Sequence, residues 1–443
     1  MKLKLSHTQI IALGFFLLIA IGTGLLMLPV STADGAGAPF LTAAFTATSA
    51  SCVTGLILQD TATYWSAFGK TVLIVLIQIG GLGFMTISTL FFLLLRRHVG
   101  LRQREVLMDS LNSTEVGGIL RLLRTILIGT VAVELLGAAA LSFRFVPMLG
   151  WGKGIGYALF HAVSAFCNAG FDLMGFQEPY SSFTSMAGDW LVNLTLIALI
   201  VIGGLGFIVW DDLAKNRLHL RRYKFQTRLV LVTSGVLLLG GAAVLFLLER
   251  NHSNAGRSVG EQVLTALFGS ATARTAGFNT VDTAALSDGG KLVTILLMFV
   301  GGSPGSTAGG VKTTSVAVLC VAAVALVRHK QCPSVLGRRV PDEALQKAVA
   351  VVGINLSLAL LGTVLLCGAQ GIPLTDALFE SFSAVGTVGM STGVTRQLNT
   401  LSAAAIALLM FVGRVGSVSF AMAFVERRAR AAVTYPTENL TIG

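Results

Sequence analysis

Charged residues are scarce in this sequence. Asp, Glu, Lys and Arg make up 12% of its 443 residues, whereas a soluble domain contains about 25%. Hydrophobic residues make up 54%, and the mean hydropathy is +0.78. So little charge cannot solvate the surface of a soluble protein of this length, and we therefore predict an integral membrane protein.

The charge that is present is mostly positive, with a formal net charge of +11. In a soluble protein such an excess would suggest nucleic acid as a partner. Here the Lys and Arg residues gather in short loops, and no basic face is interleaved with aromatic residues. This is the pattern of basic cytoplasmic loops in a membrane protein, so we expect membrane lipid, and no nucleic acid, as a partner.

Paired cysteines and catalytic motifs are missing. The five cysteines, which include no Cys-x-x-Cys, are Cys52, Cys167, Cys320, Cys332 and Cys367. This pattern argues against a disulfide framework or a metal centre. We find no HExxH, no Ser/His/Asp set, no carboxylates at catalytic spacing and no Walker phosphate-binding spacing. We therefore expect that the protein is not an enzyme, and that the lone His161 is a packed residue.

Long apolar runs dominate instead. A spanning helix needs about 20 apolar residues, and the segments that qualify are roughly 10–30, 70–95, 120–148, 187–210, 227–248, 290–327, 345–368 and 401–425. Shorter semi-apolar stretches lie between the members of each pair, at 38–51, 155–166, 260–273 and 374–385. Half-helices of this length are tolerated at membrane depth when they are buried in protein or face water. We predict that they are re-entrant pore helices.

A short phrase that ends in glycine follows each half-helix. The glycines are Gly55, Gly170, Gly277 and Gly389, and the phenylalanines that precede the phrases are Phe45, Phe160, Phe268 and Phe379. The side chains before the glycines differ, so the shared features are small residues and a glycine that permits positive φ. Coordination by backbone carbonyls is then expected, which suits a monovalent cation such as K⁺ better than Mg²⁺ or Ca²⁺. The alternative is four turns that merely close helical hairpins.

We therefore predict an all-α integral membrane fold of four pseudo-symmetric repeats around one central pore. Each repeat is a helix, a pore helix, a glycine turn and a second helix, which gives eight transmembrane helices and four re-entrant pore helices. The predicted repeats are residues 1–98, 99–216, 217–331, and 332–443 with a cytoplasmic tail. The predicted K⁺ selectivity filter comprises Cys52, Val53, Thr54, Gly55, Asn168, Ala169, Gly170, Thr275, Ala276, Gly277, Thr387, Val388 and Gly389.

Basic residues mark one side of this arrangement. They are Lys2, Lys4, Arg96, Arg97, Arg102, Arg104, Lys215, Arg217, Arg221, Arg222, Lys224, Arg328, Lys330, Arg338, Arg339, Arg427, Arg428 and Arg430. All fall on the same side when eight spanning helices are counted. The positive-inside rule places that side, with both termini, in the cytoplasm, and the glycine turns toward the outside.

Glycine clusters recur in the second helix of each repeat, at 80–84, 203–207, 301–305 and 413–416. For the first two we expect close helix packing through small residues. The third belongs to a stretch of glycines and one proline that cannot continue a helix in lipid. We predict a gate below the filter, with Ser303, Ser306 and Thr307 exposed to the pore. The gate residues are Gly301, Gly302, Ser303, Pro304, Gly305, Ser306, Thr307, Gly309, Gly310, Lys312 and Arg414.

Two arginines lie in apolar surroundings, where a charge must face protein or water. Arg414 takes the place of the second glycine of a cluster. We predict that it projects into the pore beside the interrupted helix as an electrostatic barrier, with an ion pair to Glu134 as the alternative. Arg274 lies within the third filter phrase and is expected to point behind the filter, toward Glu380 or Asp282.

Together these residues resemble the Trk/Ktr/HKT superfamily of K⁺ transporters, and most of all its Ktr-type membrane subunits. The resemblance rests on the four pore phrases, the Thr-Ala-Arg-Thr-Ala-Gly-Phe-Asn run at 272–279, the Gly-Gly-Ser-Pro-Gly-Ser-Thr-Ala-Gly-Gly-Val-Lys run at 301–312, the position of Arg414 and the Tyr-Pro-Thr-Glu sequence at 435–438. The chain starts directly with the first repeat, without the extra amino-terminal helices of Trk-type subunits, which favours the Ktr type.

The resemblance implies K⁺ uptake across a bacterial plasma membrane, a homodimer with one pore per protomer, and a cytoplasmic RCK-type regulatory ring that binds ATP or ADP. It also implies a possible activation by Na⁺, and that residues 301–312 form a gating loop above Arg414. A secondary transporter of Na⁺ or another monovalent cation is the alternative. Inverted repeats are typical of that class, whereas all four repeats here are predicted to enter from the same side.

Overall fold

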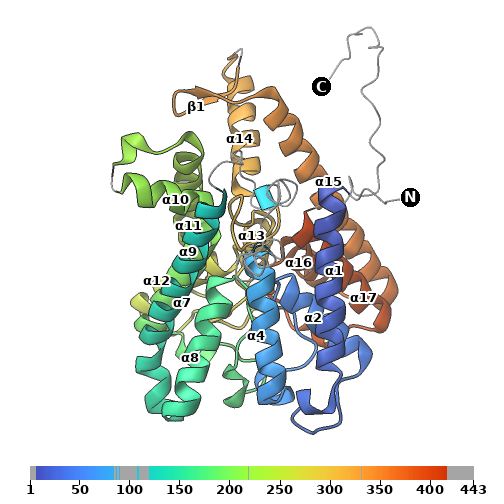
Figure 1. Ribbon diagram of the computed structural model, residues 1–443. Coiled ribbons are helices and arrows are strands. Elements are labelled where there is room, and N and C mark those ends of the chain that lie inside the picture. The colour runs from blue at the N-terminus through green and yellow to red at the C-terminus, as the bar shows by residue number, and fades with distance from the viewer. Residues whose placement is uncertain are drawn as a thin grey trace, which may run out of the picture.

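The computed structural model describes residues 6–83, 86, 89, 107–108, 119–217, 219–330 and 332–416. Within these residues the fold is a bundle of helices (Figure 1). The predicted basic residues at 2, 4, 96–104 and 427–430, and the sequence at 435–438, lie outside the described residues.

Among the described residues, four helices are long and apolar enough to cross a membrane, and a bent pair could provide a fifth span. The four are α1 (His7–Leu26), α7 (Ile119–Leu149), α11 (Phe225–Glu249) and α15 (Asp342–Gln370). They coincide with the first spanning segment predicted for each repeat. Their outer faces carry large exposed apolar side chains such as Phe16, Leu136 and Leu361, as expected of helices that contact lipid tails.

The second predicted segments are shorter or broken. They contain α4 (Ala67–Leu82), α9 (Trp190–Leu205) with α10 (Phe207–Asn216), α13 (Asp288–Phe299) with α14 (Thr313–Val327), and α17 (Thr400–Val415). Helices α4, α9 and α17 each end at a glycine, Gly83, Gly206 or Gly416, with φ of 87°, 95° and 94°. At Gly206 the axis bends by 97° into α10. The prediction of one continuous helix over 187–210 is therefore wrong, because a glycine with positive φ ends α9.

Four short helices lie between the members of these pairs. They are α2 (Phe40–Ser51), α8 (Trp151–Phe166), α12 (Val259–Thr272) and α16 (Leu374–Gly386), within a few residues of the predicted half-helices. Their carboxyl-terminal turns consist largely of buried Ala, Ser and Thr, which let neighbouring backbones approach closely. The phenylalanine that precedes each phrase is buried: Phe45, Phe160, Phe268 and Phe379.

The remaining elements are short. They are α3 (Thr61–Tyr64), the 3₁₀ turns η1 (Pro29–Ser31), η2 (Met174–Phe176), η3 (Thr184–Met186), η4 (Leu220–Arg222) and η5 (Val394–Gln397), and strands β1 (Ser334–Val335) and β2 (Arg338–Arg339). The strands pair antiparallel, with Ser334 opposite Arg339. This small hairpin, α14 and the start of α15 project beyond the rest of the bundle (Figure 1).

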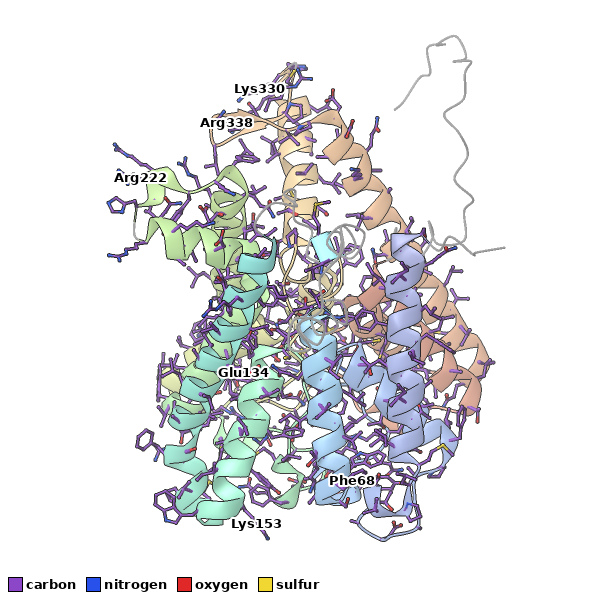
Figure 2. The ribbon with its side chains drawn as sticks, viewed as in Figure 1. Phe68, Glu134, Lys153, Arg222, Lys330 and Arg338 are labelled. Atoms are coloured by element: carbon purple, nitrogen blue, oxygen red, sulfur yellow. The ribbon has the colours of Figure 1, made fainter. Side chains whose placement is uncertain are left out.

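Basic side chains gather in that half of the molecule. Figure 2 shows Lys330 and Arg338 on the projection and Arg222 on a separate lobe beside it, while Lys153 and Phe68 mark the opposite end and Glu134 lies midway. The loops that the sequence groups on one side are therefore together in space, in the part of the chain that the structure describes.

Candidate functional site

The four glycine phrases share one backbone conformation. In each phrase the glycine and the residue two places before it have positive φ, and the residue between them does not. The non-glycine members are Val53, Asn168, Thr275 and Thr387, with φ of 57°, 58°, 78° and 51°. Such φ values are unfavourable for Val and Thr, which occupy three of the four positions, whereas Asn tolerates them. The recurrence of one unusual conformation in all four phrases indicates a shared demand on the direction of the backbone carbonyls.

The phrases meet in a closed ring, which we call the filter ring. A Cβ atom added to Gly170 would lie 2.7 Å from the carbonyl oxygen of Ala276. The same relation connects all four phrases, and the pairs are Gly55 with Ala169, Gly170 with Ala276, Gly277 with Val388, and Gly389 with Thr54. Each glycine thus faces the carbonyl that precedes the glycine of the next phrase. The geometry favours a ring over four unrelated turns, because separate hairpin closures need not contact one another.

Hydroxyl groups of the short helices support the ring from behind. The amides of Gly55 and Gly389 donate to Ser49 Oγ at 3.0 Å and Ser383 Oγ at 3.1 Å. In the other two phrases the hydroxyl donates to the carbonyl just after the glycine, from Ser164 to Phe171 and from Thr272 to Phe278, each at 2.7 Å. These bonds fix the backbone of the ring without using the carbonyls that face the glycine of the neighbouring phrase.

The four glycines also line a cavity of about 60 Å³, which we call the outer mouth. Its other lining residues include Asp60, Asp172, Tyr180 and Arg396. The four glycines of the ring and two carboxylates therefore line the same cavity.

The 301–312 loop lies between α13 and α14, within two residues of the predicted boundaries. Gly301 N–H donates to Val311 O at 2.9 Å, which closes the loop at its base. The loop packs on the bent helix pair α9 and α10: Ser303 N–H donates to Gly204 O at 2.9 Å, and Phe207 N–H donates to Gly305 O at 2.8 Å. The loop is therefore hydrogen-bonded to both of these helices.

Arg414 bridges this loop to α4. Its guanidinium donates to the carbonyl of Thr307 and to the carbonyls of Gly80 and Gly81, the last at 3.1 Å. Lys312 Nζ donates within the loop to Ala308 O at 2.7 Å. Both cations thus bind backbone carbonyls in or beside the loop.

These features led us to compare the chain with known proteins. A family model for TrkH, described as a cation transport protein, matches residues 5–431. The chain belongs to this family. It is 38% identical to the potassium/sodium uptake protein NtpJ of Enterococcus hirae, over 99% of this chain and 98% of that protein. It is 37% identical to the Ktr system potassium uptake protein B of Bacillus subtilis, over 99% of this chain and 97% of that protein.

The fold agrees with this assignment. The crystal structure of the potassium transporter TrkH from Vibrio parahaemolyticus aligns with a TM-score of 0.74, over 96% of this chain and 86% of that chain, at 19% identity. The predicted resemblance to the Trk/Ktr superfamily is therefore confirmed, and the chain is a membrane protein of a cation transport family rather than a member of an enzyme family.

Two expectations about side chains are wrong in this TrkH-family structure. Ser303 and Thr307 are buried rather than exposed, because Ser303 Oγ contacts Thr313 Oγ1 at 3.1 Å and Thr307 Oγ1 donates to Phe166 O at 3.1 Å. Ser306 is half-buried and donates to Ser303 O.

The alternative partner proposed for Arg414 is also not found. Glu134 accepts a hydrogen bond from Gln78 Nε2 at 3.3 Å, and no ion pair between Glu134 and Arg414 occurs among the described residues. Carbonyl dipoles, rather than a carboxylate, accompany this intramembrane guanidinium.

Arg274 points behind the filter ring, as predicted, but its predicted partners are wrong. Its guanidinium donates to Ser234 O and Ser234 Oγ on α11, both at 3.3 Å, and not to Glu380 or Asp282. Glu380 is instead fully buried and accepts from Ser391, Thr392 and Thr395 in the loop after the fourth phrase.

Replacing Arg274 should weaken selectivity. Arg274→Gln removes a brace between the third phrase and α11, so we expect a decrease of K⁺ over Na⁺ discrimination by about tenfold, the equivalent of about one charge-assisted hydrogen bond. The measurement is competition of Na⁺ against Rb⁺ uptake, with the amount of protein in the membrane as the control. Selectivity equal to that of the unaltered protein would show that Arg274 has no bracing role.

Sequence reasoning missed the carbonyls of the glycine clusters. Gly80 and Gly203 do pack closely, since an added Cβ on either would overlap the carbonyl oxygen of Ser51 or Phe166. Their own carbonyls, however, also accept hydrogen bonds, Gly80 from Arg414 and Gly203 from the amide of Thr307 at 3.4 Å. The recurrence of the clusters indicates that these positions matter. The sequence does not show which carbonyls accept hydrogen bonds, because every residue has a backbone carbonyl.

The contacts of the Asn168 side chain could not be predicted from the sequence either. This carboxamide donates to Thr275 Oγ1 at 3.2 Å in the next phrase and accepts from Thr307 Oγ1 at 3.2 Å in the 301–312 loop. One buried side chain therefore contacts both the filter ring and the loop.

Loss of the hydrogen bond between Thr307 and Asn168 should change both the rate of uptake and its selectivity. For Thr307→Val, which keeps the shape but removes the hydroxyl, we expect both faster uptake and weaker discrimination between K⁺ and Na⁺, by a factor of about three to ten for one neutral hydrogen bond. Thr313→Val is the matched control, because that hydroxyl contacts Ser303 and not the ring. If Thr307→Val changed the rate alone, Asn168 would not connect the two parts.

Proposed function

We propose that this protein takes up K⁺ across a bacterial plasma membrane through the filter ring. The observation that carries the proposal is the closed set of four phrases, in which each glycine faces the carbonyl of the next phrase. Backbone carbonyls replace the hydration shell of K⁺ without a fixed negative charge. The Bacillus subtilis relative is named a potassium uptake protein and the Enterococcus hirae relative a potassium/sodium uptake protein, and both names support the choice of ion.

The architecture that we propose is the four-repeat pore. The repeats are residues 1–98, 99–216, 217–331 and 332–443, with α2, α8, α12 and α16 as pore helices. Each short helix precedes one phrase of the ring, and each phrase is followed by a second helix that is short or broken. This order supports eight membrane segments, with both termini on the side of the basic loops.

We further propose that the 301–312 loop, with Arg414, is the gate. Buried Ser303 and Thr307, the bonds to Gly203 and Gly204, and the bridge from Arg414 support a closed position of this loop. Opening would require these hydrogen bonds to break together, which suits control by a partner from outside the membrane.

Regulation is proposed to come from a cytoplasmic RCK-type ring that binds ATP or ADP and contacts a homodimer of this chain. The word "system" in the names of the Bacillus subtilis and Vibrio alginolyticus relatives supports a separate regulatory component. The half of the molecule that carries Arg222, Lys330 and Arg338 offers it basic side chains (Figure 2). Activation by Na⁺ belongs to the same proposal, as the potassium/sodium name of the Enterococcus hirae relative suggests.

Growth of a bacterium that lacks K⁺ uptake tests this function. The strain would express the chain with and without a Ktr-type ring subunit, at low K⁺ and at two Na⁺ concentrations. Rescue that requires the ring is the expected result, and a dependence on Na⁺ would show activation. No rescue by well-expressed protein under any condition would favour the alternative, a secondary transporter of Na⁺ or another monovalent cation.

A further inference from the structure

One basic side chain lines the outer mouth. Arg396 is the only Lys or Arg among the described residues around this cavity, which also contains the four glycines of the filter ring. The guanidinium is exposed, and it forms no ion pair with the described carboxylates. A fixed, unpaired positive charge above a site for cations is unexpected, because it repels the ions that the site takes.

The side chain of Arg396 is held in place by an aromatic ring. Its Cζ lies 3.9 Å from the centre of the Tyr180 ring, within the range of a cation–π contact. Tyr180 is itself fixed, since its amide donates to Asp60 Oδ2 at 2.9 Å and its hydroxyl donates to Leu58 O at 3.4 Å. Tyr180 of the second repeat therefore supports the guanidinium of Arg396, which belongs to the fourth repeat.

The backbone of Arg396 is fixed as well. Arg396 lies in η5, directly after Thr395, whose hydroxyl donates to the buried carboxylate of Glu380. On the other side, Gln370 donates to the carbonyl of Gln397. With anchors before and after it and the Tyr180 ring against it, this exposed arginine is held beside the outer mouth.

Two carboxylates line the same cavity. Asp60 caps α3 and accepts from the amides of Ala62, Thr63 and Tyr180, so amide dipoles surround its charge. Asp172 accepts from the amide of Met174 at 2.9 Å. The mouth thus combines negative charge that attracts cations with one positive charge that limits how strongly they accumulate.

We propose that Arg396, placed by Tyr180, is a valence-selective element that keeps divalent cations out of the outer mouth. A given positive potential repels a divalent ion with twice the energy of a monovalent one, so the penalty factor for a divalent ion is the square of the factor for K⁺. The positive charge of Arg396 lowers the affinity for K⁺ slightly and raises the discrimination of the mouth against divalent ions. This inference rests on the proposed K⁺ uptake.

Transport by purified protein in liposomes tests it, with Rb⁺ as the transported ion and Ba²⁺ as the probe, because Ba²⁺ is divalent and close to K⁺ in size. For Arg396→Gln we expect the KM for Rb⁺ to fall by about threefold. The Ba²⁺ concentration that halves uptake should fall by about tenfold when it is measured at Rb⁺ concentrations well below KM. Both shifts should shrink when an impermeant organic salt raises the ionic strength.

Two variants serve as controls. Arg396→Lys keeps the charge and should remain close to the unaltered protein. Arg144→Gln removes an arginine of α7 that pairs with Asp189 at 2.7 Å and does not line the mouth, so neither KM nor Ba²⁺ inhibition should change. Equal Ba²⁺ inhibition in Arg396→Gln and the unaltered protein would overturn the inference. Absence of Rb⁺ uptake in the unaltered protein would instead overturn the proposed function.

Discussion

Gly389→Ala should abolish high-affinity K⁺ uptake while the protein still folds into the membrane. A Cβ at this position would overlap the carbonyl oxygen of Thr54 and lie 2.9 Å from the Cα of Gly55. The fourth phrase would have to move away from the first, which opens the ring and separates the carbonyls that replace water around the ion. We expect the KM for K⁺ to rise by at least about tenfold, and Na⁺ to compete better, measured by uptake at matched protein amounts.

Gly393→Ala separates crowding from backbone strain. Gly393 has φ of 96°, close to the 92° of Gly389, but an added Cβ would meet nothing within 4 Å. Both variants impose the same penalty for a side chain at positive φ, and only one of them intrudes on the ring. Similar losses of K⁺ affinity in both would mean that strain, and not the closed ring, determines the phenotype.

Removing the guanidinium of Arg414 should release the gate. In Arg414→Ala the carbonyl of Thr307 would lose its link to Gly80 and Gly81. A hydrogen bond to a charged group contributes about 1.5–3 kcal/mol, so the closed position should lose enough stability for uptake without the regulatory ring to rise by about tenfold or more. The measurement is Rb⁺ uptake by the chain alone, in liposomes.

Arg414→Lys distinguishes a clamp from an electrostatic barrier. Lysine keeps the positive charge but lacks the planar fork that reaches carbonyls on two elements at once. A clamp predicts that Arg414→Lys is nearly as leaky as Arg414→Ala, whereas a barrier predicts that it resembles the unaltered protein. Flux and selectivity that stay unchanged in Arg414→Ala would contradict both roles.

The sequence predicts the elements of this fold better than their interruptions. The half-helices were located within a few residues because each combines a short semi-apolar stretch with a glycine turn, and both signals are local. The ends of α4 and α9 were missed because Gly83 and Gly206 lie in apolar runs, where glycine is also common for packing. Whether such a glycine has positive φ depends on the carbonyls around it, as with Pro304 O beside Gly206.

Partners across the bundle could not be predicted in the same way. The position of Arg274 in a filter phrase indicated that it must point away from the ions, which is correct, yet its acceptor is a carbonyl and a hydroxyl of Ser234 and not a carboxylate. A search of the sequence for residues of opposite charge finds only Asp and Glu as partners of an arginine, and so it misses carbonyl and hydroxyl acceptors. The closed order of the filter ring likewise depends on contacts between distant repeats, which no single phrase contains.

The most direct test of the account is ion competition in liposomes that contain only this protein and the regulatory ring proposed for it. Rb⁺ uptake driven by a membrane potential would be measured while external K⁺ or Na⁺ is raised, for the unaltered protein and Gly389→Ala. We predict that K⁺ displaces Rb⁺ at far lower concentration than Na⁺ does, and that this difference largely disappears in Gly389→Ala. Equal displacement by K⁺ and Na⁺ in the unaltered protein would contradict a K⁺-selective carbonyl filter.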